Sequence, residues 1–356
     1  MPKLIKSRRK KRGLPAGSLV PTGDVKQLPF RLRWTRYSAS SVQSHPIHSL
    51  KELTETPLSH DEVHWLDLCG SAPAESLETL GQHFGVHPLW LEDILNTDHR
   101  PKLDELSDHL FLITKWASID PKEGSLVFQQ ISLLWFKNTV FSIREQDIDL
   151  FQNLLERIEQ AKGRLRTQPA DHLFYVLTDI IVDQYYFVLE ELGNRVEKLE
   201  SALRSEDFED RTPREILQLK NDFLLLRKSF FPLRDALFRI VRSPNEGLSE
   251  STRLFFGDAN EHVVQISETI GFYEQMLESL ARFFESTLNQ RTNEIVKTLT
   301  LFTSFFVPAS FLAGVYGMNF KILPELHWPY GYAFFWGVIA GLSIILYLFF
   351  KKKRWL

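Results

Sequence analysis

The 356-residue sequence contains a single cysteine. One thiol cannot close an intramolecular disulfide, and it cannot supply the several thiolates of a multi-cysteine zinc or iron–sulfur site. The sequence therefore excludes a disulfide-stapled scaffold and suits a reducing cytosol. At roughly 100 to 200 residues per domain, the length is sufficient for two structural units and a sizeable core.

The motifs of the common enzyme classes are also missing. The sequence has no His-Glu-x-x-His, no Gly-x-Ser-x-Gly and no phosphate-binding Gly-x-x-x-x-Gly-Lys. His87, His99 and His262 are isolated in the sequence, which is typical of structural histidines. We therefore expect neither an enzyme nor an organic cofactor.

Charged residues are absent from two long stretches near the end of the chain. Residues 298–320 contain none, and residues 326–350 contain none apart from the protonatable His327. About 20 residues at ~1.5 Å each cross a hydrocarbon core of ~30 Å, so both stretches predict spanning helices. Pro308 is tolerated in the first because neighbouring helices satisfy the carbonyl that it frees. The alternative is a pair of buried helices in a soluble core.

Basic residues collect at both ends of the chain. Of 42 Lys and Arg, seven lie in the first twelve residues and four in the last six, whereas the body between is acidic. Basic clusters beside membrane spans stay on the cytoplasmic side. Two spans then place both termini and the acidic body in the cytoplasm, as in a multi-pass protein of the inner membrane. The basic N-terminal tail is expected to lie on anionic membrane lipid rather than on nucleic acid.

The region between Pro29 and Arg144 alternates short apolar runs with helical patterns, which predicts an α/β domain. The expected elements are strands at 30–37, 64–68, 109–117, 128–136 and 139–144, a helix at 74–84 and a turn of helix at 91–96.

Long helical patterns follow from about residue 148. A helix over 171–203 and another that begins at Thr212 predict an antiparallel hairpin. A further helix runs from about Thr252 into the first span with no clear turn signal, so it predicts a long stalk. Apolar residues at steps of three and four form a seam along it, namely Val263, Ile266, Ile270, Tyr273, Leu277, Leu280 and Phe284.

These patterns predict an α/β domain with a long stalk helix that continues into a two-span α-helical membrane domain. The segments are a basic tail and lead-in (1–28), the cytoplasmic α/β domain (29–170), the helical hairpin (171–247), the cytoplasmic part of the stalk (248–292), the first transmembrane helix (293–317), an outer loop (318–330), the second transmembrane helix (331–350) and a basic C-terminus (351–356).

The first span ends in Tyr316-Gly317-Met318-Asn319-Phe320. Here the sequence resembles the CorA family of magnesium channels, in which Gly-Met-Asn precedes a short loop, a second span and a basic end. The resemblance covers the whole chain. It extends to Gly13-Leu14-Pro15, His87-Pro88-Leu89, residues 91–96, Arg100-Pro101-Lys102, Thr292-Asn293-Glu294, Pro324-Glu325-Leu326 and the Lys-Lys-Lys-Arg-Trp-Leu ending. It implies transport of Mg²⁺, and of Co²⁺, by a funnel-shaped homopentamer whose first span lines the pore.

The residues at this point suit a hydrated cation. Mg²⁺ prefers six oxygens and releases its waters reluctantly. A ring of neutral Asn319 amides, with the carbonyls of Gly317 and Met318, offers acceptors to the protons of those waters. Two spans cannot enclose an aqueous path, so several copies of the chain are required.

Gly317, Met318 and Asn319 are the expected selectivity filter. Positions three or four residues apart, counted from this filter toward the start of the first span, form a stripe of side chains without fixed charge. Its apolar members are expected to close the path by dewetting, and the resemblance implies that Asn293 forms a second polar ring at the cytoplasmic mouth. The alternative for the stripe is helix packing. The positions are Asn293, Val296, Leu299, Thr303, Val307, Ser310 and Gly314.

The resemblance also implies a regulatory Mg²⁺ site between subunits. It maps onto Asp93, beside Glu92, facing Asp258 of the neighbouring subunit, with Asp179 close by. A cation between carboxylates favours one arrangement of subunits, so cytosolic Mg²⁺ is expected to close the pentamer. Glu325 in the outer loop is expected to attract cations.

Two other functions fit parts of the same pattern. One is a zinc transporter of the same superfamily, and the other is a membrane-anchored receptor whose two spans enclose no pore. Flux of Mg²⁺ through the purified protein separates both from a magnesium channel.

Overall fold

A computed structural model describes residues 13, 15, 17–21, 28–106, 109–146, 150–205, 212–319 and 327–355. The chain divides into two compact units, Met1–Glu278 and Ser279–Leu356. Helix α7 (Glu250–Tyr316) begins in the first unit and ends in the second. The basic residues of the first twelve positions and Glu325 lie outside the described residues.

The first unit is built on a seven-stranded mixed sheet with the order β2-β1-β3-β7-β6-β5-β4. β3 and β7 pair in parallel, and the other neighbouring strands pair antiparallel. The strands are β1 (Arg31–Tyr37), β2 (Val42–Ile47), β3 (Val63–Cys69), β4 (Lys102–Leu106), β5 (His109–Ile119), β6 (Leu126–Phe136) and β7 (Thr139–Arg144).

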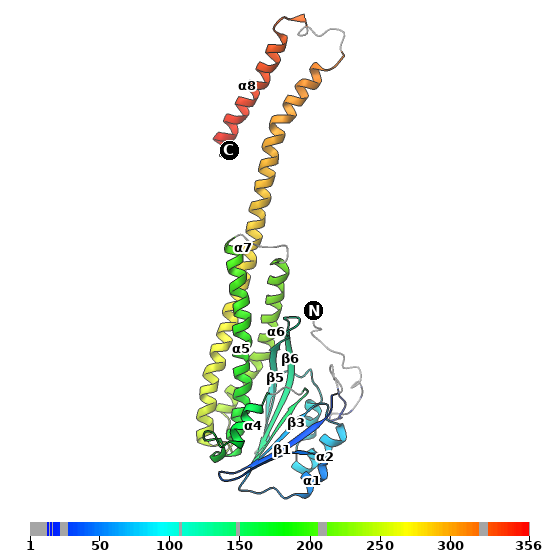
Figure 1. Ribbon diagram of the computed structural model, residues 1–356, viewed down its shortest axis with the longest axis vertical. Coiled ribbons are helices and arrows are strands. Elements are labelled where there is room, and N and C mark those ends of the chain that lie inside the picture. The colour runs from blue at the N-terminus through cyan, green and yellow to red at the C-terminus, as the bar shows by residue number, and fades with distance from the viewer. Residues whose placement is uncertain are drawn as a thin grey trace. The chain divides into compact units, whose positions relative to one another are not determined.

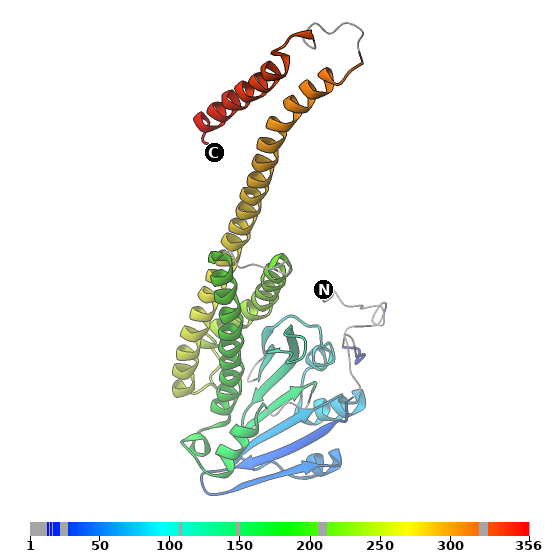
Figure 2. The ribbon, with the colours of Figure 1, turned by 45° about the horizontal axis from the view of Figure 1, so that its top comes forward.

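Helices cover both faces of this sheet (Figures 1 and 2). The short helices α1 (Leu50–Glu55), α2 (Ala74–Phe84) and α3 (Pro88–Ile94) share one apolar core with one face, where Leu66 and Phe111 are fully buried. The long helices α5 (Ala170–Arg204) and α6 (Thr212–Val241) cover the other face. Burial of both faces explains the continuous apolar runs of β5 and β6.

The start of α7 packs with α5 and α6 as a third long helix of the first unit (Figure 1). The first part of the predicted apolar seam is buried here, where Val263, Ile266 and Ile270 have no exposed surface. The ring of Tyr273 lies 5.4 Å from that of Phe223 on α6. On α5, a Cβ added at Gly193 would lie 2.5 Å from the Tyr273 hydroxyl, so the close approach of α5 and α7 depends on this glycine.

The second unit contains the end of α7 and the helix α8 (Gly331–Lys352). Phe305 contacts Phe350 and Tyr316 contacts Phe335, so the two helices run antiparallel. Both are long and apolar enough to cross a membrane, and their most apolar windows are 0% and 6% buried. α7 stays helical through Pro308.

This architecture confirms the α/β domain, the long helix that continues into an apolar segment, and the two apolar C-terminal helices. The sequence did not predict β2, α1, β4 or the short helix α4 (Gln152–Glu159).

Candidate functional site

The first candidate region is the C-terminal end of α7. The helix ends at Tyr316, after which the amide of Gly317 donates to the carbonyl of Ala313 at 2.9 Å and that of Met318 to Val315 at 3.2 Å. A Cβ at Gly317 would meet the Ala313 oxygen at 3.3 Å, so glycine permits this tight exit. Gly317, Met318 and Asn319 are all exposed. Their carbonyl and amide oxygens are therefore accessible at the helix end.

The seven stripe positions form one exposed face of α7. None is covered by α8, and Val296, Leu299 and Val307 are 54–63% exposed. At about 100° per residue, the centre of the stripe lies about 180° around the helix from the residues directed at α8. Of those residues, Phe305 contacts Phe350 and Tyr316 contacts Phe335. The half-buried Pro308 and Leu312 lie on the same face of α7.

Large apolar side chains occupy a different part of the exposed surface. Ile295, Phe302 and Phe306 are 62–69% exposed and lie between the stripe and the α8 contact. Between Thr303 and Gly314 the stripe instead holds the small or hydroxylated Thr303, Ser310 and Gly314, together with Val307. α7 therefore presents a bulky apolar face and a small, partly polar face, each of which can meet a different environment.

The second candidate region is an acidic cluster on α5 and α7, formed by Asp179, Asp183 and Asp258. The hydroxyl of Tyr175 donates to Asp179, and His262 lies near enough to act on its charge. The pKa of Asp179 is raised to about 6, mainly by burial and also by the charges of Asp183 and Asp258, against the hydrogen bond from Tyr175. The folded chain thus brings Asp258 close enough to Asp179 to act on its charge, and it makes the ionisation of Asp179 unfavourable.

Asp93 lies in a different electrostatic environment on α3. Its carboxylate is 2.8 Å from Lys102 Nζ and 3.2 Å from His99 Nε2. Partial burial raises the pKa of Asp93, but the hydrogen bonds from His99 and Lys102 outweigh it and hold the pKa below its ordinary value. Asp93 is therefore a carboxylate whose charge is already balanced by the ammonium group of Lys102.

Glu92, the neighbour of Asp93, points elsewhere. Its Oε2 accepts a hydrogen bond from the backbone amide of Gly17 at 2.6 Å. Glu92, which the sequence predicted beside Asp93 at the regulatory site, thus helps to hold Gly17 against α3.

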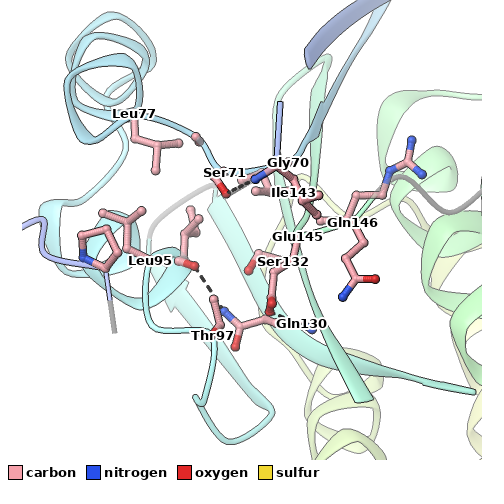
Figure 3. A pocket seen from close by; sticks show the side chains of 15 residues that line it. Gly70, Ser71, Leu77, Leu95, Thr97, Gln130, Ser132, Ile143, Glu145 and Gln146 are labelled. Carbon is pink, nitrogen blue, oxygen red and sulfur yellow. Dashed lines mark hydrogen bonds between the residues drawn. The ribbon is translucent and has the colours of Figure 1, made fainter. Parts of the chain in front are cut away.

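The sheet holds α3 in position through Gln130 on β6. Its side-chain amide donates to the carbonyls of Asp93 at 3.2 Å and Ile94 at 3.4 Å, and its oxygen accepts from Lys115 Nζ at 3.1 Å. Lys115 also donates to the carbonyl of Thr97. Figure 3 shows Gln130 and Thr97 at a cavity of ≈ 80 Å³, close to the end of α3. Asp93 is therefore carried on a helix end that hydrogen bonds to the sheet hold in place.

In the part of the chain that the structure describes, no group of three or more His, Cys, Asp or Glu side chains is arranged to hold a metal ion. Sequence reasoning did not include Asp183, Tyr175 and His262 in the acidic cluster. The four-residue steps from Asp179 to Tyr175 and Asp183, and from Asp258 to His262, place each pair on one helix face and were a usable signal. The partners of Asp93 depend on the tertiary fold.

Comparison with known proteins gives a consistent assignment. The family described as "CorA-like Mg2+ transporter protein" matches residues 60–352. The cobalt/magnesium transport protein CorA of Thermotoga maritima is 33% identical over 346 residues, which cover 97% of this chain and 98% of the relative. The magnesium transport protein CorA of Wolinella succinogenes is 25% identical, and the match covers 85% of this chain and 94% of the relative.

Solved structures share the fold at lower identity. The complete CorA magnesium transporter of Methanocaldococcus jannaschii superposes with a TM-score of 0.75 at 22% identity, covering 91% of this chain and 98% of its own. The cytoplasmic domain of ZntB from Vibrio parahaemolyticus gives a TM-score of 0.58 at 15% identity, and the match covers 75% of this chain and 100% of the ZntB domain. These likenesses concern the fold alone.

Proposed function

The chain belongs to the CorA family of Mg²⁺ transporters, and on this premise we propose that it is a homopentameric channel for the uptake of hydrated Mg²⁺, with Co²⁺ and Ni²⁺ as further cargo. The relatives from Thermotoga maritima and Wolinella succinogenes are named a cobalt/magnesium and a magnesium transport protein. In this proposal the two apolar helices cross the inner membrane, the pentamer forms a funnel, and both termini lie in the cytoplasm.

The observation that carries the proposal is the exposed, uncharged stripe of α7 opposite α8. If five copies turn this face toward a common axis, α8 lies on the outside of each first helix, and the bulky residues Phe302 and Phe306 meet lipid or neighbouring helices. Thr303 and Ser310 then offer hydroxyls to the path, and Val296, Leu299 and Val307 form apolar rings that close it by dewetting. Asn293 forms the polar ring at the cytoplasmic mouth.

At the outer end, five copies of Gly317, Met318 and Asn319 form the selectivity filter. Neutral oxygens attract the protons of the bound waters without replacing those waters, which matches the reluctance of Mg²⁺ to dehydrate. Glu325, outside the described residues, adds negative charge near this entrance. The membrane potential drives entry, because 100 mV inside negative gives a divalent cation about 4.6 kcal/mol.

We assign closure of the channel to cytosolic Mg²⁺ bound between subunits. Asp179 and Asp258 of one subunit form a repelling pair, and Asp93 and Glu92 of the next would supply further oxygens. Carboxylate oxygens suit Mg²⁺, and a site with both Asp93 and Asp258 is completed by a second copy. Mg²⁺ bound there offsets the repulsion and favours the closed arrangement; loss of the ion releases it.

Flux into liposomes tests the channel. Purified protein reconstituted with an internal Mg²⁺ dye should admit Mg²⁺ under an inside-negative potential, and Asn319→Ala should reduce the influx about tenfold, because the ring loses its water acceptors. Asn153→Ala, an exposed amide on α4, is the matched control.

The same measurement separates the alternatives. A zinc transporter would admit Zn²⁺ and exclude Mg²⁺, and an anchored receptor would admit neither ion. Either result with the wild-type protein overturns the proposal.

A further inference from the structure

A basic cavity of ≈ 310 Å³ lies between α4 and the strands β1, β2, β3 and β7 of the first unit. It is separate from the acidic cluster, which is on α5 and α7. Its chemistry is set by six residues, namely Arg31, Arg33, Arg144, Asp67, Trp65 and Phe151.

The strand register places the arginines on one face of the sheet. Arg31 on β1 is directly opposite Cys69 on β3, and Arg33 is opposite Asp67. In the parallel pair of β3 and β7, Cys69 in turn is opposite Arg144. Because side chains at directly opposed positions project from the same face, three guanidinium groups gather at one end of this part of the sheet.

Asp67, the one carboxylate among the described residues that line the cavity, is already engaged. Asp67 Oδ2 accepts from Arg144 Nη2 at 2.7 Å, and Asp67 Oδ1 accepts from the hydroxyl of Ser142 at 2.6 Å. Ser142 in turn accepts from Trp65 Nε1 at 2.9 Å. This network fixes the floor of the cavity and leaves Asp67 unable to neutralise the remaining arginines.

Arg33 is the guanidinium with free hydrogen-bonding capacity. It is exposed, and among the described residues it has no hydrogen bond or ion pair. Its five donors form a planar fork that matches a phosphate group. The positive charge of Arg33 at the cavity thus favours an anion and repels the divalent cations that the acidic cluster attracts.

The walls provide an apolar part and a second source of positive potential. Phe151 lies 5.9 Å from Trp65 and beneath the guanidinium of Arg144, and the half-buried Phe30 also lines the cavity. Helix α4 begins at Gln152, another lining residue, so the positive end of its dipole lies at the cavity. The volume falls at the lower end of the range of small-molecule pockets, roughly 300–1,000 Å³, and far exceeds that of a phosphate ion.

We propose that this cavity binds a small organic phosphate of nucleotide size, with Arg33 as the principal phosphate contact and the aromatic wall beside the organic part. The site is independent of the ion path and of the acidic cluster.

Isothermal titration calorimetry of the full-length protein in detergent tests the proposal. The probes are ADP, AMP, pyrophosphate and inorganic phosphate, with adenosine as the uncharged control, all in EDTA so that no Mg²⁺ bridges phosphate to the acidic residues. ADP or AMP should bind more tightly than inorganic phosphate, adenosine should give no binding heat, and the affinity should fall as salt rises. Pyrophosphate binding as tightly as ADP would overturn the organic part of the proposal.

Variants locate the binding. Arg33→Gln should weaken ADP binding about tenfold, whereas Arg33→Lys should retain part of the affinity. Arg36→Gln is the matched control, because Arg36 is on the same strand but bonds to Gln43. The proposal fails if none of the phosphates binds at millimolar concentration, or if Arg33→Gln binds ADP as tightly as the wild type.

Discussion

The ammonium group of Lys102 lies 2.8 Å from the carboxylate of Asp93. The acid proposed to share a regulatory Mg²⁺ with a neighbouring subunit therefore already has a cation beside it. Lys102 also pairs with Asp104, and both carboxylates raise the pKa of Lys102 despite its partial burial, so the lysine stays charged at neutral pH. A divalent ion that approaches Asp93 has to compete with this charge.

Replacement of Lys102 by glutamine should make the channel more sensitive to cytosolic Mg²⁺. Removal of the competing charge leaves more negative potential at Asp93, so half-maximal inhibition should move to a Mg²⁺ concentration lower by about threefold or more. The measurement is Mg²⁺ current against internal Mg²⁺ in patches. Lys162→Gln, an exposed lysine next to α4, is the control. An unchanged or higher half-inhibitory concentration would show that Lys102 does not oppose the regulatory ion.

Inhibition by Mg²⁺ should weaken in acid because of Asp179. With its pKa raised to about 6, Asp179 holds a proton at pH 5.5 that Mg²⁺ must displace, whereas at pH 7.5 it is a carboxylate. The apparent affinity for Mg²⁺ should therefore be about fourfold lower at pH 5.5. Currents at the two pH values measure this.

Two variants separate Asp179 from other titrating groups. Asp179→Asn should lose most of this pH dependence, and Asp258→Ala should lose inhibition by internal Mg²⁺. Full inhibition in Asp258→Ala would remove the acidic cluster from the account.

Asp222 on α6 is a buried acid that weakens the fold at neutral pH. Its side chain is 6% exposed, burial raises its pKa to about 6, and Arg195 is 4.0 Å away and lowers the pKa only in part. The folded state thus binds this proton more tightly than the unfolded chain, and stability falls as pH rises from about 4 to about 6.

Asp222→Asn removes this ionisation and should raise the free energy of unfolding by about 1–2 kcal/mol at pH 8, with no gain below pH 4. Thermal unfolding of the full-length protein in detergent at both pH values measures the change. A lower melting temperature at pH 8 would mean that the Asp222 charge is fully compensated by Arg195.

Two helix glycines should respond in opposite ways to alanine. A Cβ at Gly271 on α7 meets nothing within 4 Å, so Gly271→Ala should stabilise the fold by about 0.5–1 kcal/mol through helix propensity. At Gly193 the added Cβ would meet the Tyr273 hydroxyl at 2.5 Å, so the same substitution should lower the melting temperature. Equal shifts for both variants would contradict the close packing of α5 against α7.

The strongly patterned elements were predictable from the sequence, and the weakly patterned ones were not. α2 follows from its apolar periodicity and from Gly85, which ends the helix with φ 68°. β2 was missed because an edge strand pairs on one side only, and its Gln43, Ser44 and Pro46 give no apolar alternation.

In the candidate site, too, some features were predictable from local sequence patterns and others depend on tertiary packing. The stripe on α7 follows from helical periodicity alone, because its members recur at steps of three and four on one helix. Asp179 and Asp258 are nearly eighty residues apart in sequence, and their proximity depends on the packing of α5 against α7. The pairing of Asp93 with Lys102 depends on how α3 meets β4, which no local pattern encodes.

Thiol modification of single positions on α7 tests most directly whether the uncharged stripe lines the ion path. The chain has one cysteine, the buried Cys69, so Cys69→Ser gives a thiol-free background. Val307→Cys on the stripe and Phe302→Cys beside it can then be exposed to a charged, membrane-impermeant methanethiosulfonate while Mg²⁺ flux is recorded. The account predicts that modification blocks flux through Val307→Cys and leaves flux through Phe302→Cys unchanged. Block at Phe302→Cys with none at Val307→Cys would contradict it.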